Sequence, residues 1–523
     1  MTTEMHPTRW GDPAEAAPLP QATRDLVELA LGVRDSPAVE HAALPPSGIS
    51  AEVLAELRAL LGDDQVLTDD DTRRLRTRGK STPDLLRARQ GDLSDAPDAV
   101  VRPATHADVR ALLDLAVRHR LAVVPFGGGT SVTGGLVARR EGLAGVLSLD
   151  LCRMKALRDV DLTSMTAVLE PGLRGPEAEA LLAEHGLTLG HFPQSFEYAS
   201  IGGFAATRSS GQSSAGYGRF DALVVGLTMA TPQGTLELGS APANAAGPDL
   251  RQLVLGSEGT LGVITAVRVR VRPRPTIKVY EGWQFDSFAV GADAMRTLAQ
   301  AGLLPTVIRL SDENETALNL ASQSDVGGSA AGGCLMIVGH EGVDAELIEA
   351  RRGLVTAQLT RLGGTALGEE RGQAWAEGRF HAPYLRDSLL DVGVLVETLE
   401  TATFWSNRER LYGAVKAALT EKLGEQTLVL CHISHVYETG CSLYFTVAAP
   451  GGETPLETWQ GAKAAATQAM VDAGATVTHH HAVGSDHKQW FAQEIGPVGV
   501  QVLRAVKREL DPTGVLNPGV MIP

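Results

Sequence analysis

The chain has 523 residues, 44% of them hydrophobic, which is enough to fill two or three folded domains. Its formal net charge of −16 argues against nucleic acid or an anionic membrane surface as a main partner, because such partners require clustered Lys and Arg. The four cysteines, Cys152, Cys334, Cys431 and Cys441, form no CxxC pair and no zinc-ligand spacing, which fits a reducing compartment. Because the sequence shows no apolar leader and no run long enough to span a membrane, we expect a cytoplasmic protein.

The most regular part of the sequence is predicted to begin near residue 98. Residues 1–48 are rich in Ala and Pro and predict a loose arm, and residues 49–95 predict a helical segment. Residues 98–103, "DAVVRP", then predict a strand, and 105–120 a helix with Thr105 and Asp108 in capping-box positions. The following "LAVVPF" predicts a second strand, so this stretch forms a βαβ unit.

The second strand of this unit leads directly into "GGGTSVTGG". Gly127, Gly128 and Gly129 allow positive φ, and a turn of successive N–H groups forms a nest for phosphate. A flexible turn is the plainer alternative, and the run matches neither a Rossmann nor a Walker A pattern. The glycines by themselves therefore do not name a nucleotide.

More strands are predicted before residue 275. "TAVLEPG" predicts a strand, 174–186 a helix capped by Gly186, "LVVGLTMATPQGTLEL" a hairpin that turns at 232–234, and "LGVITAVRVRVRP" a closing strand. Two loops between them, "PQSFEYASIGGFAATRSSG" and "GSEGTLG", are dense in small residues. Such loops serve either close backbone packing or the approach of backbone to a ligand.

The order of "PFGGGTSVTGG", "PQSFEYASIGGFAATRSSG", "GSEGTLGVIT", "SHVYETGCSLYF", "THHHAVG" and "LDPTGVLNPG" resembles the FAD-binding proteins of the vanillyl-alcohol oxidase (PCMH) type. Within that superfamily the chain is most similar to the alkyldihydroxyacetonephosphate synthase family, also called alkylglycerone-phosphate synthase, as a bacterial-type homologue. The likeness runs from about Ile49 to the C-terminus. "SHVYETG" with "THHH" is its specific part, because the glycine-rich loops are shared with D-lactate and glycolate dehydrogenases.

The resemblance implies an α+β fold. A two-subdomain FAD-binding domain is expected over 96–274, and a cap domain with an antiparallel sheet and helices over 275–470. Residues 471–523 are expected to return to the flavin. The substrate is expected between the two domains, where concave sites commonly lie.

The resemblance also implies FAD bound by three loops. The residues are Pro125, Phe126, Gly127, Gly128, Gly129, Thr130 and Ser131 in the first loop; Gln194, Ser195, Phe196, Glu197, Tyr198, Ala199, Ser200, Thr207, Arg208, Ser209 and Ser210 in the second; and Glu258, Gly259, Thr260, Leu261, Gly262, Val263 and Ile264 in the third. No His or Cys lies in 121–140, where related proteins with tethered flavin often carry the attachment residue, so we expect non-covalent FAD. Two departures from the family pattern are Gln194, where an acidic residue is usual, and Ala482, where Gly commonly follows the histidines.

The three consecutive histidines, His479, His480 and His481, allow several interpretations. If 478–482 is extended, His479 and His481 face one way and His480 the other, which disfavours three equivalent metal ligands. A metal held by a His-x-His pair with His435 or Asp486, and imidazoles without a role, are the alternatives to a proton-transfer site. The family places this triplet in the active centre, and we expect no metal.

The resemblance assigns acid–base work to Tyr437 and the three histidines, anion or leaving-group stabilisation to Arg309, and substrate binding to Arg386. An ordinary strand tyrosine and ion-paired arginines are the plainer alternatives. The implied reaction, a transferase step of ether-lipid biosynthesis, exchanges the acyl group of acyl-dihydroxyacetone phosphate for a fatty alcohol through a flavin N5 adduct without net redox.

The alternative function is that of an FAD-dependent 2-hydroxy-acid dehydrogenase or oxidase, in which an arginine binds the substrate carboxylate. A flavin-free binding protein would need the three loops to be empty. We expect a small-molecule or lipid substrate, no nucleic acid, at most peripheral membrane contact, and a homodimer.

Overall fold

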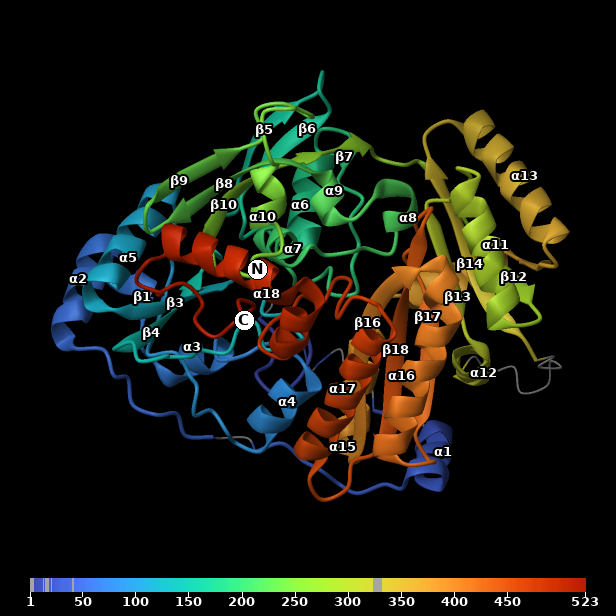
Figure 1. Ribbon diagram of the computed structural model, residues 1–523, viewed down its shortest axis with the longest axis horizontal. Helices are drawn as coiled ribbons and strands as arrows, with labels where there is room; N and C mark the ends of the chain where they lie inside the picture. Colours follow the sequence, from blue (N-terminus) through green and yellow to red (C-terminus); the bar gives the residue numbers. More distant parts are fainter. Residues whose placement is uncertain (1–3, 13, 15–17, 20, 40–41, 323–331) are drawn as a thin grey trace.

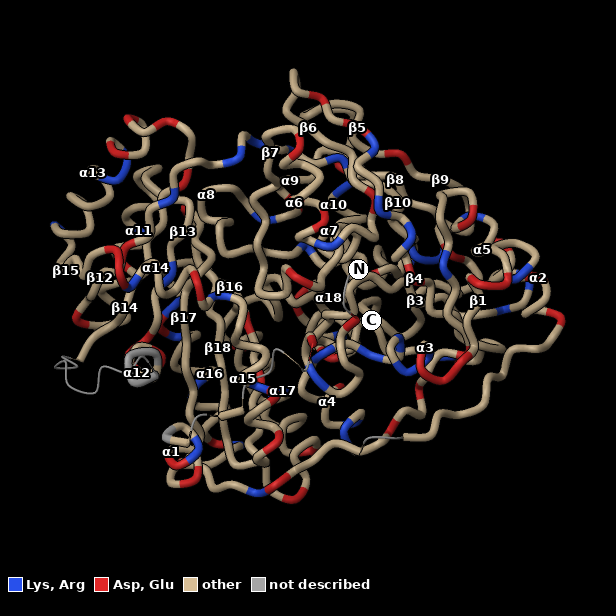
Figure 2. The backbone as a smooth tube through the Cα atoms, turned by 180° about the vertical axis from the view of Figure 1, so that it is seen from behind, with Lys and Arg blue, Asp and Glu red and all other residues tan. Residues whose placement is uncertain are grey.

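A computed structural model describes residues 4–12, 14, 18–19, 21–39, 42–322 and 332–523. Three sheets dominate it, two in the first half of the chain and one in the second (Figure 1). Among these described residues no helix is both long enough and apolar enough to cross a membrane. Figure 2 shows Lys and Arg scattered among Asp and Glu along the backbone rather than gathered in one basic stretch.

The first sheet has the order β1–β2–β4–β3, in which β2, β4 and β3 are parallel and β1 is antiparallel. Its strands are β1 (Val66–Leu67), β2 (Ala99–Val101), β3 (Leu121–Phe126) and β4 (Gly145–Asp150). The predicted βαβ unit is confirmed, because α5 (His106–His119) joins β2 to β3 and begins at a capping box made by Thr105 and Asp108. Val109, Leu112, Leu113 and Ala116 on one face of α5 are buried, and Val117 is half-buried.

The second sheet is antiparallel, in the order β5–β6–β10–β8–β9. Its strands are β5 (Leu157–Asp161), β6 (Thr166–Leu169), β8 (Val224–Thr231), β9 (Gly234–Leu238) and β10 (Val263–Arg270). The predicted hairpin turning at 232–234 is confirmed as β8 and β9. The predicted helix is shorter than expected: α6 (Gly175–Ala183) ends at Glu184, and two further turns lead to Gly186 at φ +71°.

Short helices surround these two sheets. They are α2 (Ala51–Leu61), η2 (Asp63–Gln65), α3 (Asp70–Leu75), α4 (Thr82–Arg89), α7 (Ile201–Thr207), α8 (Ser214–Tyr217), α9 (Phe220–Leu223) and α10 (Leu250–Val254), with a small sheet of β7 (Leu187–Thr188) and β11 (Arg272–Pro273). The two sheets have separate hydrophobic cores, one around α5 and β3 and one around α7 and β10. The first half of the chain is therefore built from two packed units.

The third sheet has seven antiparallel strands in the order β15–β12–β14–β13–β17–β18–β16. They are β12 (Ile277–Phe285), β13 (Val307–Ser311), β14 (Cys334–Gly342), β15 (Thr365–Gly368), β16 (Val394–Phe404), β17 (Leu428–Ile433) and β18 (Gly440–Pro450). The helices of this part are α11 (Phe288–Gln300), α12 (Glu313–Ser322), α13 (Ala345–Arg361), α14 (Glu369–Gly378), α15 (Ala382–Asp391), η3 (Trp405–Asn407), α16 (Arg408–Leu423) and α17 (Pro455–Asp472).

The two faces of this sheet have different partners. Helices α11, α13, α16 and α17 share one hydrophobic core with the sheet. Along β17, Val429, Cys431 and Ile433 enter that core, whereas the alternating Leu430 and His432 point to the other face. This alternation is the period of a strand with two different surroundings. The other face packs against α14 at β12, and its strands β13, β16, β17 and β18 line a cavity.

The C-terminal segment packs against the first half of the chain, and the N-terminal arm contacts both halves. After α18 (Lys488–Leu510), Leu516 pairs with Val123 of β3, so the C-terminal segment extends the first sheet. The arm expected to be loose contains helix α1 (Gln21–Leu31), and its Met5 and Trp10 are buried against Tyr198 and Tyr384. These contacts join aromatic residues far apart in the chain, which a search for periodicity in the arm does not reveal.

Candidate active site

A cavity of about 490 Å³ lies between the loops of the first half and the face of the seven-stranded sheet that points away from α11, α13, α16 and α17. Its wall contains all of Pro125–Ser131, residues of the 193–212 loops, and Glu258 with Gly259. The opposite wall comes from α15, β13, β16, β17 and β18, together with His480 and His481. The substrate site expected between the two halves of the chain thus corresponds to a real hollow.

The glycines after β3 are required by close packing. A Cβ on Gly128 would overlap the carbonyl oxygen of Tyr198, and one on Gly127 would overlap the Ser200 hydroxyl. Gly129 has φ +72°, a conformation that side-chain-bearing residues rarely adopt. The run is consequently a fixed turn rather than a flexible one, and its backbone lies on the cavity wall.

The cavity has polar groups that fit a dinucleotide. Gln194 Nε2 and Gln212 Oε1 are buried on its wall without a hydrogen-bond partner among the described residues. Buried polar groups of this kind are normally satisfied, so they mark a place where a ligand supplies donors and acceptors. Together with the packed glycine turn and the cavity volume, they fit the polar edges of FAD.

Not all residues of the three predicted FAD loops line the cavity. Seven of their residues lie off its wall, namely Phe196, Glu197, Tyr198, Arg208, Thr260, Leu261 and Val263. Arg208 turns away to bind Asp221 and backbone carbonyls, and Leu261 belongs to the core around β10. These residues shape the loops rather than line the hollow.

Glu258 has a structural position that its motif did not reveal. Its carboxylate accepts hydrogen bonds from the backbone N–H groups of Val483 and Gly484, at distances of 2.9–3.2 Å. Burial raises the pKa of Glu258 to about 8, although these N–H donors favour the charged form. A predicted cofactor loop is thereby tied to the segment that follows the histidines.

The two predicted arginines both lie on the wall. Arg309 on β13 forms an ion pair with Glu315 at 2.6 Å and contacts His432 at 3.0 Å. Burial favours the neutral form of Glu315, but His432 and Arg309 outweigh it and lower the pKa of Glu315 to about 2. The ion-paired alternative thus describes Arg309 correctly, and its guanidinium still faces the cavity.

Arg386 on α15 is held by two neighbours. Its Nη1 donates to the Lys80 carbonyl at 2.6 Å and its Nε to Asp387 at 3.2 Å, while the buried Nη2 makes no hydrogen bond in the described structure but lies 3.2 Å from Asp387 Oδ1 in an ion pair. Lys80 lies beside it, buried, with burial as the main cause that lowers its pKa to about 8. This corner of the wall can receive an anion.

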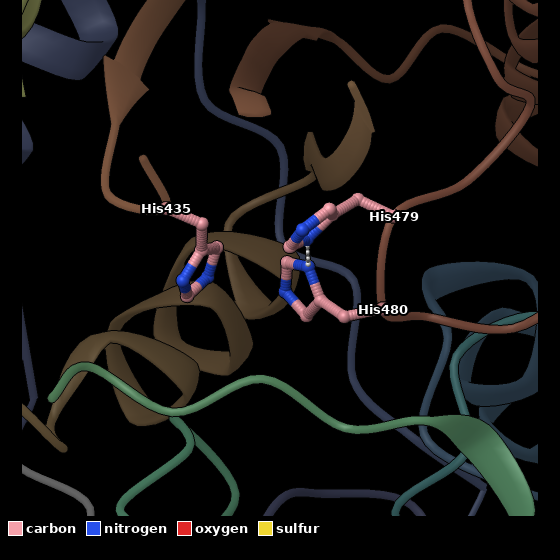
Figure 3. A group of neighbouring side chains, drawn as sticks. All are labelled: His435, His479 and His480. Carbon is pink, nitrogen blue, oxygen red and sulfur yellow. Dashed lines mark hydrogen bonds between the residues drawn. The ribbon is translucent and has the colours of Figure 1, made fainter. Parts of the chain in front are cut away.

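The histidines and Tyr437 form a connected network. The Tyr437 hydroxyl lies 2.5 Å from His479 Nε2, and His479 Nδ1 lies 2.9 Å from His480 Nδ1. His435 stacks on His479 with ring centroids 4.9 Å apart (Figure 3). Because His480 and His435 line the cavity, this network connects Tyr437 to the cavity wall, which Tyr437 itself does not line.

Residues 478–482 are not an extended strand, and the predicted alternation of the histidines is wrong. The rings of His479 and His480 converge instead of facing opposite ways (Figure 3). Ala482, where the family usually has Gly, adopts φ +73°. The segment is a turn, and its shape depends on hydrogen bonds from distant parts of the chain.

Burial keeps His435, His479 and Tyr437 uncharged at neutral pH. Burial and then the neighbouring imidazoles lower the pKa of His435 and of His479 well below the ordinary value. Burial raises the pKa of Tyr437 to about 12, although Arg219 opposes this by its charge and hydrogen bond. The network therefore contains neutral imidazoles and a neutral phenol that hold donors and acceptors ready for proton transfer.

His435, His479 and His480 also satisfy the distance criteria for a metal site, with ligand atoms within 4.8 Å of one another. Four of their six ring nitrogens are in hydrogen bonds, to Ser210 and Ser214, to Tyr437, and between His479 and His480. A metal would have to displace these partners. The arrangement suits proton transfer better than ligation.

Sequence reasoning missed two charged residues of the site. Glu400 on β16 accepts hydrogen bonds from the backbone of the histidine turn, and Arg219 donates to the carbonyl of His479 at 3.1 Å. Neither residue belongs to a motif with a recognisable spacing, since both lie far from the histidines in the chain. Only the fold brings them together.

Comparison with known proteins defines the class. Residues 97–239 match the FAD binding domain family, and residues 274–521 match the C-terminal domain of FAD linked oxidases. Together with the cavity and its glycine turn, these matches define an FAD-dependent flavoenzyme, which sets aside the flavin-free alternative.

Individual proteins that are similar to this chain identify its family within this class. The chain is 34% identical to alkyldihydroxyacetonephosphate synthase of Trypanosoma brucei brucei, over 92% of this chain and 82% of that one, and 33% identical to the enzyme of Dictyostelium discoideum, over 93% and 83%. A solved alkyldihydroxyacetonephosphate synthase structure superposes with a TM-score of 0.85 at 30% identity, covering 98% of both chains. The chain belongs to the alkyldihydroxyacetonephosphate synthase family.

Proposed function

We propose that this chain is an FAD-dependent alkylglycerone-phosphate synthase, which exchanges the acyl group of acyl-dihydroxyacetone phosphate for a fatty alcohol without net redox. The observation that carries the proposal is the hydrogen-bonded line Tyr437–His479–His480, which ends on the wall of the cavity. Family membership supports the same reaction, because the relatives named above carry this synthase's name.

FAD would be held by the backbone of Pro125–Ser131 and by Gln194, Ser200 and Ser209 on the cavity wall. When bound, FAD supplies the covalent chemistry by which C1 of the substrate exchanges one oxygen substituent for another. The protein supplies orientation, exclusion of water, proton transfer and anion binding. We propose that the binding is non-covalent, and acid precipitation should then leave the yellow colour in the supernatant.

The line of hydrogen bonds has a definite direction. With Tyr437 protonated, its O–H donates to His479 Nε2, so His479 Nδ1–H donates to His480 Nδ1, which leaves His480 Nε2–H as the outer end. In this form the line delivers a proton to the cavity. After the phenol proton has moved, Arg219 lies next to the phenolate and the line can take a proton back.

The two arginines suit the anionic groups of the reaction. Arg309 would stabilise the departing fatty acid carboxylate, because its guanidinium lies on the wall near His432 and can bind a carboxylate. The guanidinium of Arg386, which is ion-paired with Asp387 but has no hydrogen bond at Nη2 in the described structure, would bind the substrate phosphate. Replacement of Arg386 by Ala is expected to raise the KM for the phosphate substrate more than it lowers kcat.

The deciding experiment is an incubation of the yellow protein with acyl-dihydroxyacetone phosphate and a labelled long-chain alcohol, without an electron acceptor. We expect labelled ether together with free fatty acid by mass spectrometry. Absence of ether, with turnover of 2-hydroxy acids and an artificial acceptor, would instead support the dehydrogenase alternative. The homodimer, the cytoplasmic location and peripheral membrane contact stay predictions.

A further inference from the structure

Glu400 lies on β16, beneath the histidine turn, with a side chain that is 1% exposed. One carboxylate accepts hydrogen bonds from three consecutive backbone N–H groups, those of His479 (2.6 Å), His480 (3.2 Å) and His481 (2.9 Å). The Thr478 hydroxyl donates to the same group at 2.5 Å. Four donors on one buried carboxylate form a compact anion-binding turn.

This arrangement explains why the segment is a turn. Three successive N–H groups point at one carboxylate only if the backbone curves around it, because in a strand they alternate in direction. The curve brings the rings of His479 and His480 together, with their Nδ1 atoms 2.9 Å apart. On the far side of Ala482 at φ +73°, Glu258 accepts the next two N–H groups.

Glu400 also places a negative charge beside the imidazoles. Its Oε2 lies 3.4 Å from His480 Nδ1, and its Oε1 lies 3.9 Å from His481 Nδ1. Arg219, which donates to the His479 carbonyl, is a further charged neighbour of the turn. A histidine that gains a proton there gains it next to a carboxylate, which lowers the cost of the positive charge.

We propose that Glu400 is a positioning residue of the synthase reaction, which holds the histidine turn in the curvature that links Tyr437 to the cavity and balances positive charge on its imidazoles during turnover. The proposal rests on the proposed function and deepens it. Glu400 makes no contact with the cavity, since β16 contributes only Val396, Glu397 and Thr398 to the wall. It acts through the histidines.

The ionisation of Glu400 is consistent with this role. Burial opposes the charged form, but His480, His481 and His479 outweigh burial and hold the pKa of Glu400 well below its ordinary value. The carboxylate is therefore charged at neutral pH. Its charge is present before the histidines take part in proton transfer.

The test is Glu400→Gln, which keeps the size of the side chain and one acceptor but removes the charge and aims an NH₂ group at backbone donors. We expect kcat for ether formation to fall at least about 10-fold, while the KM for acyl-dihydroxyacetone phosphate and the FAD content stay within about 2-fold of wild type. Glu400→Asp keeps the charge and should recover part of kcat.

Glu494→Gln is the matched control. Glu494 accepts hydrogen bonds from the Val477 backbone at 2.8 Å and the Thr476 hydroxyl at 2.9 Å, just before the turn, without touching the histidines. The Glu494→Gln substitution should leave kcat unchanged. If Glu400→Gln has wild-type kcat, or if kcat falls only in proportion to lost FAD, the proposal is overturned.

Hydrogen exchange separates this proposal from the proposed function. Amides 479–481 should exchange at least 10-fold faster in Glu400→Gln holoenzyme than in wild type, and Glu494→Gln should leave them unchanged. If wild type makes no ether but exchange still rises, the synthase assignment fails and the positioning of the turn stands. Unchanged exchange contradicts the positioning role, whatever the activity of wild type.

Discussion

Tyr437 is joined to the active cavity only through an imidazole. Its hydroxyl lies 2.5 Å from His479, and burial raises its pKa to about 12, so the phenol is protonated at neutral pH. Tyr437→Phe removes the end of the proton line without changing its packing. We expect kcat to fall about 10²- to 10⁴-fold with FAD still bound, measured by ether formation and flavin absorbance.

Tyr412→Phe is the control for this substitution. Tyr412 donates a hydrogen bond to Asp312 at 2.8 Å and packs on the helix-covered side of the sheet, away from the cavity. The Tyr412→Phe substitution should lower the stability of the protein but leave kcat near the wild-type value. A fully active Tyr437→Phe enzyme would remove Tyr437 from the proposed proton line.

Ala482 occupies a left-handed conformation that favours glycine. At φ +73° its Cβ is crowded by the backbone, and only the hydrogen bonds on either side of it fix this shape. Ala482→Gly should therefore stabilise the fold by about 0.5–1 kcal/mol, after allowance for the greater freedom of glycine in the unfolded chain. Chemical denaturation of the holoenzyme measures this difference.

Ala301→Gly provides the comparison. Ala301 is exposed and has an ordinary helical φ of −90° at the end of α11, so glycine there should destabilise by a few tenths of a kcal/mol or more. If both substitutions change stability in the same direction, the conformation of Ala482 is not strained.

At the scale of the element, the glycine turn after β3 depends on the loop before α7. A side chain on Gly128 would overlap the Tyr198 carbonyl and push the two loops apart. Gly128→Ala should therefore yield a folded but colourless protein, with FAD affinity reduced at least about 100-fold, in a titration that follows flavin fluorescence.

Gly413→Ala tests whether this effect is specific. Gly413 lies in the exposed part of α16 with nothing near its added Cβ, so alanine should raise helix stability by about 1 kcal/mol and leave FAD binding unchanged. Full FAD binding by Gly128→Ala would show that the two loops can separate without loss of the site.

Elements with a local signal were predictable. The capping box of α5 and the hairpin of β8 and β9 are specified by neighbouring residues, and both form as predicted. The shape of 478–482 was not predictable, because the distant carboxylate of Glu400 decides it. Local patterns fail where the partner is far away in the chain.

At the scale of the molecule, buried histidines should make stability depend on pH. Burial lowers the pKa of His191, His481 and His487 to about 3, from an ordinary value of 6.5. Between pH 3 and 6.5 the unfolded chain therefore binds more protons than the native protein at these sites, so stability rises with pH. Their contribution is complete above pH 6.5 and is lost as pH falls towards 3.

Buried carboxyl groups with a raised pKa oppose this slope. Burial raises the pKa of Glu258 to about 8 and that of Asp84 to about 6, so these groups favour the native protein at lower pH. The effect of the three histidines on stability is larger than that of Glu258 and Asp84. The free energy of unfolding should therefore fall by about 1 kcal/mol or more from pH 6.5 to 5.5. Urea titrations at several pH values measure this free energy. His191→Gln should reduce its dependence on pH. A free energy of unfolding that stays constant over this pH range would contradict the prediction.

The sequence predicted the class of fold and the FAD cofactor through its resemblance to a family, and it predicted the capping box of α5 and the hairpin of β8 and β9 because those residues act on their neighbours. The tertiary structure decided how the site is assembled. Glu400 reaches the histidines across 79 residues of chain, His479 reaches Tyr437 across 42, and a core cluster joins Met5 and Trp10 to Tyr384. Such contacts leave no spacing in the sequence, since burial and packing of whole sheets select them.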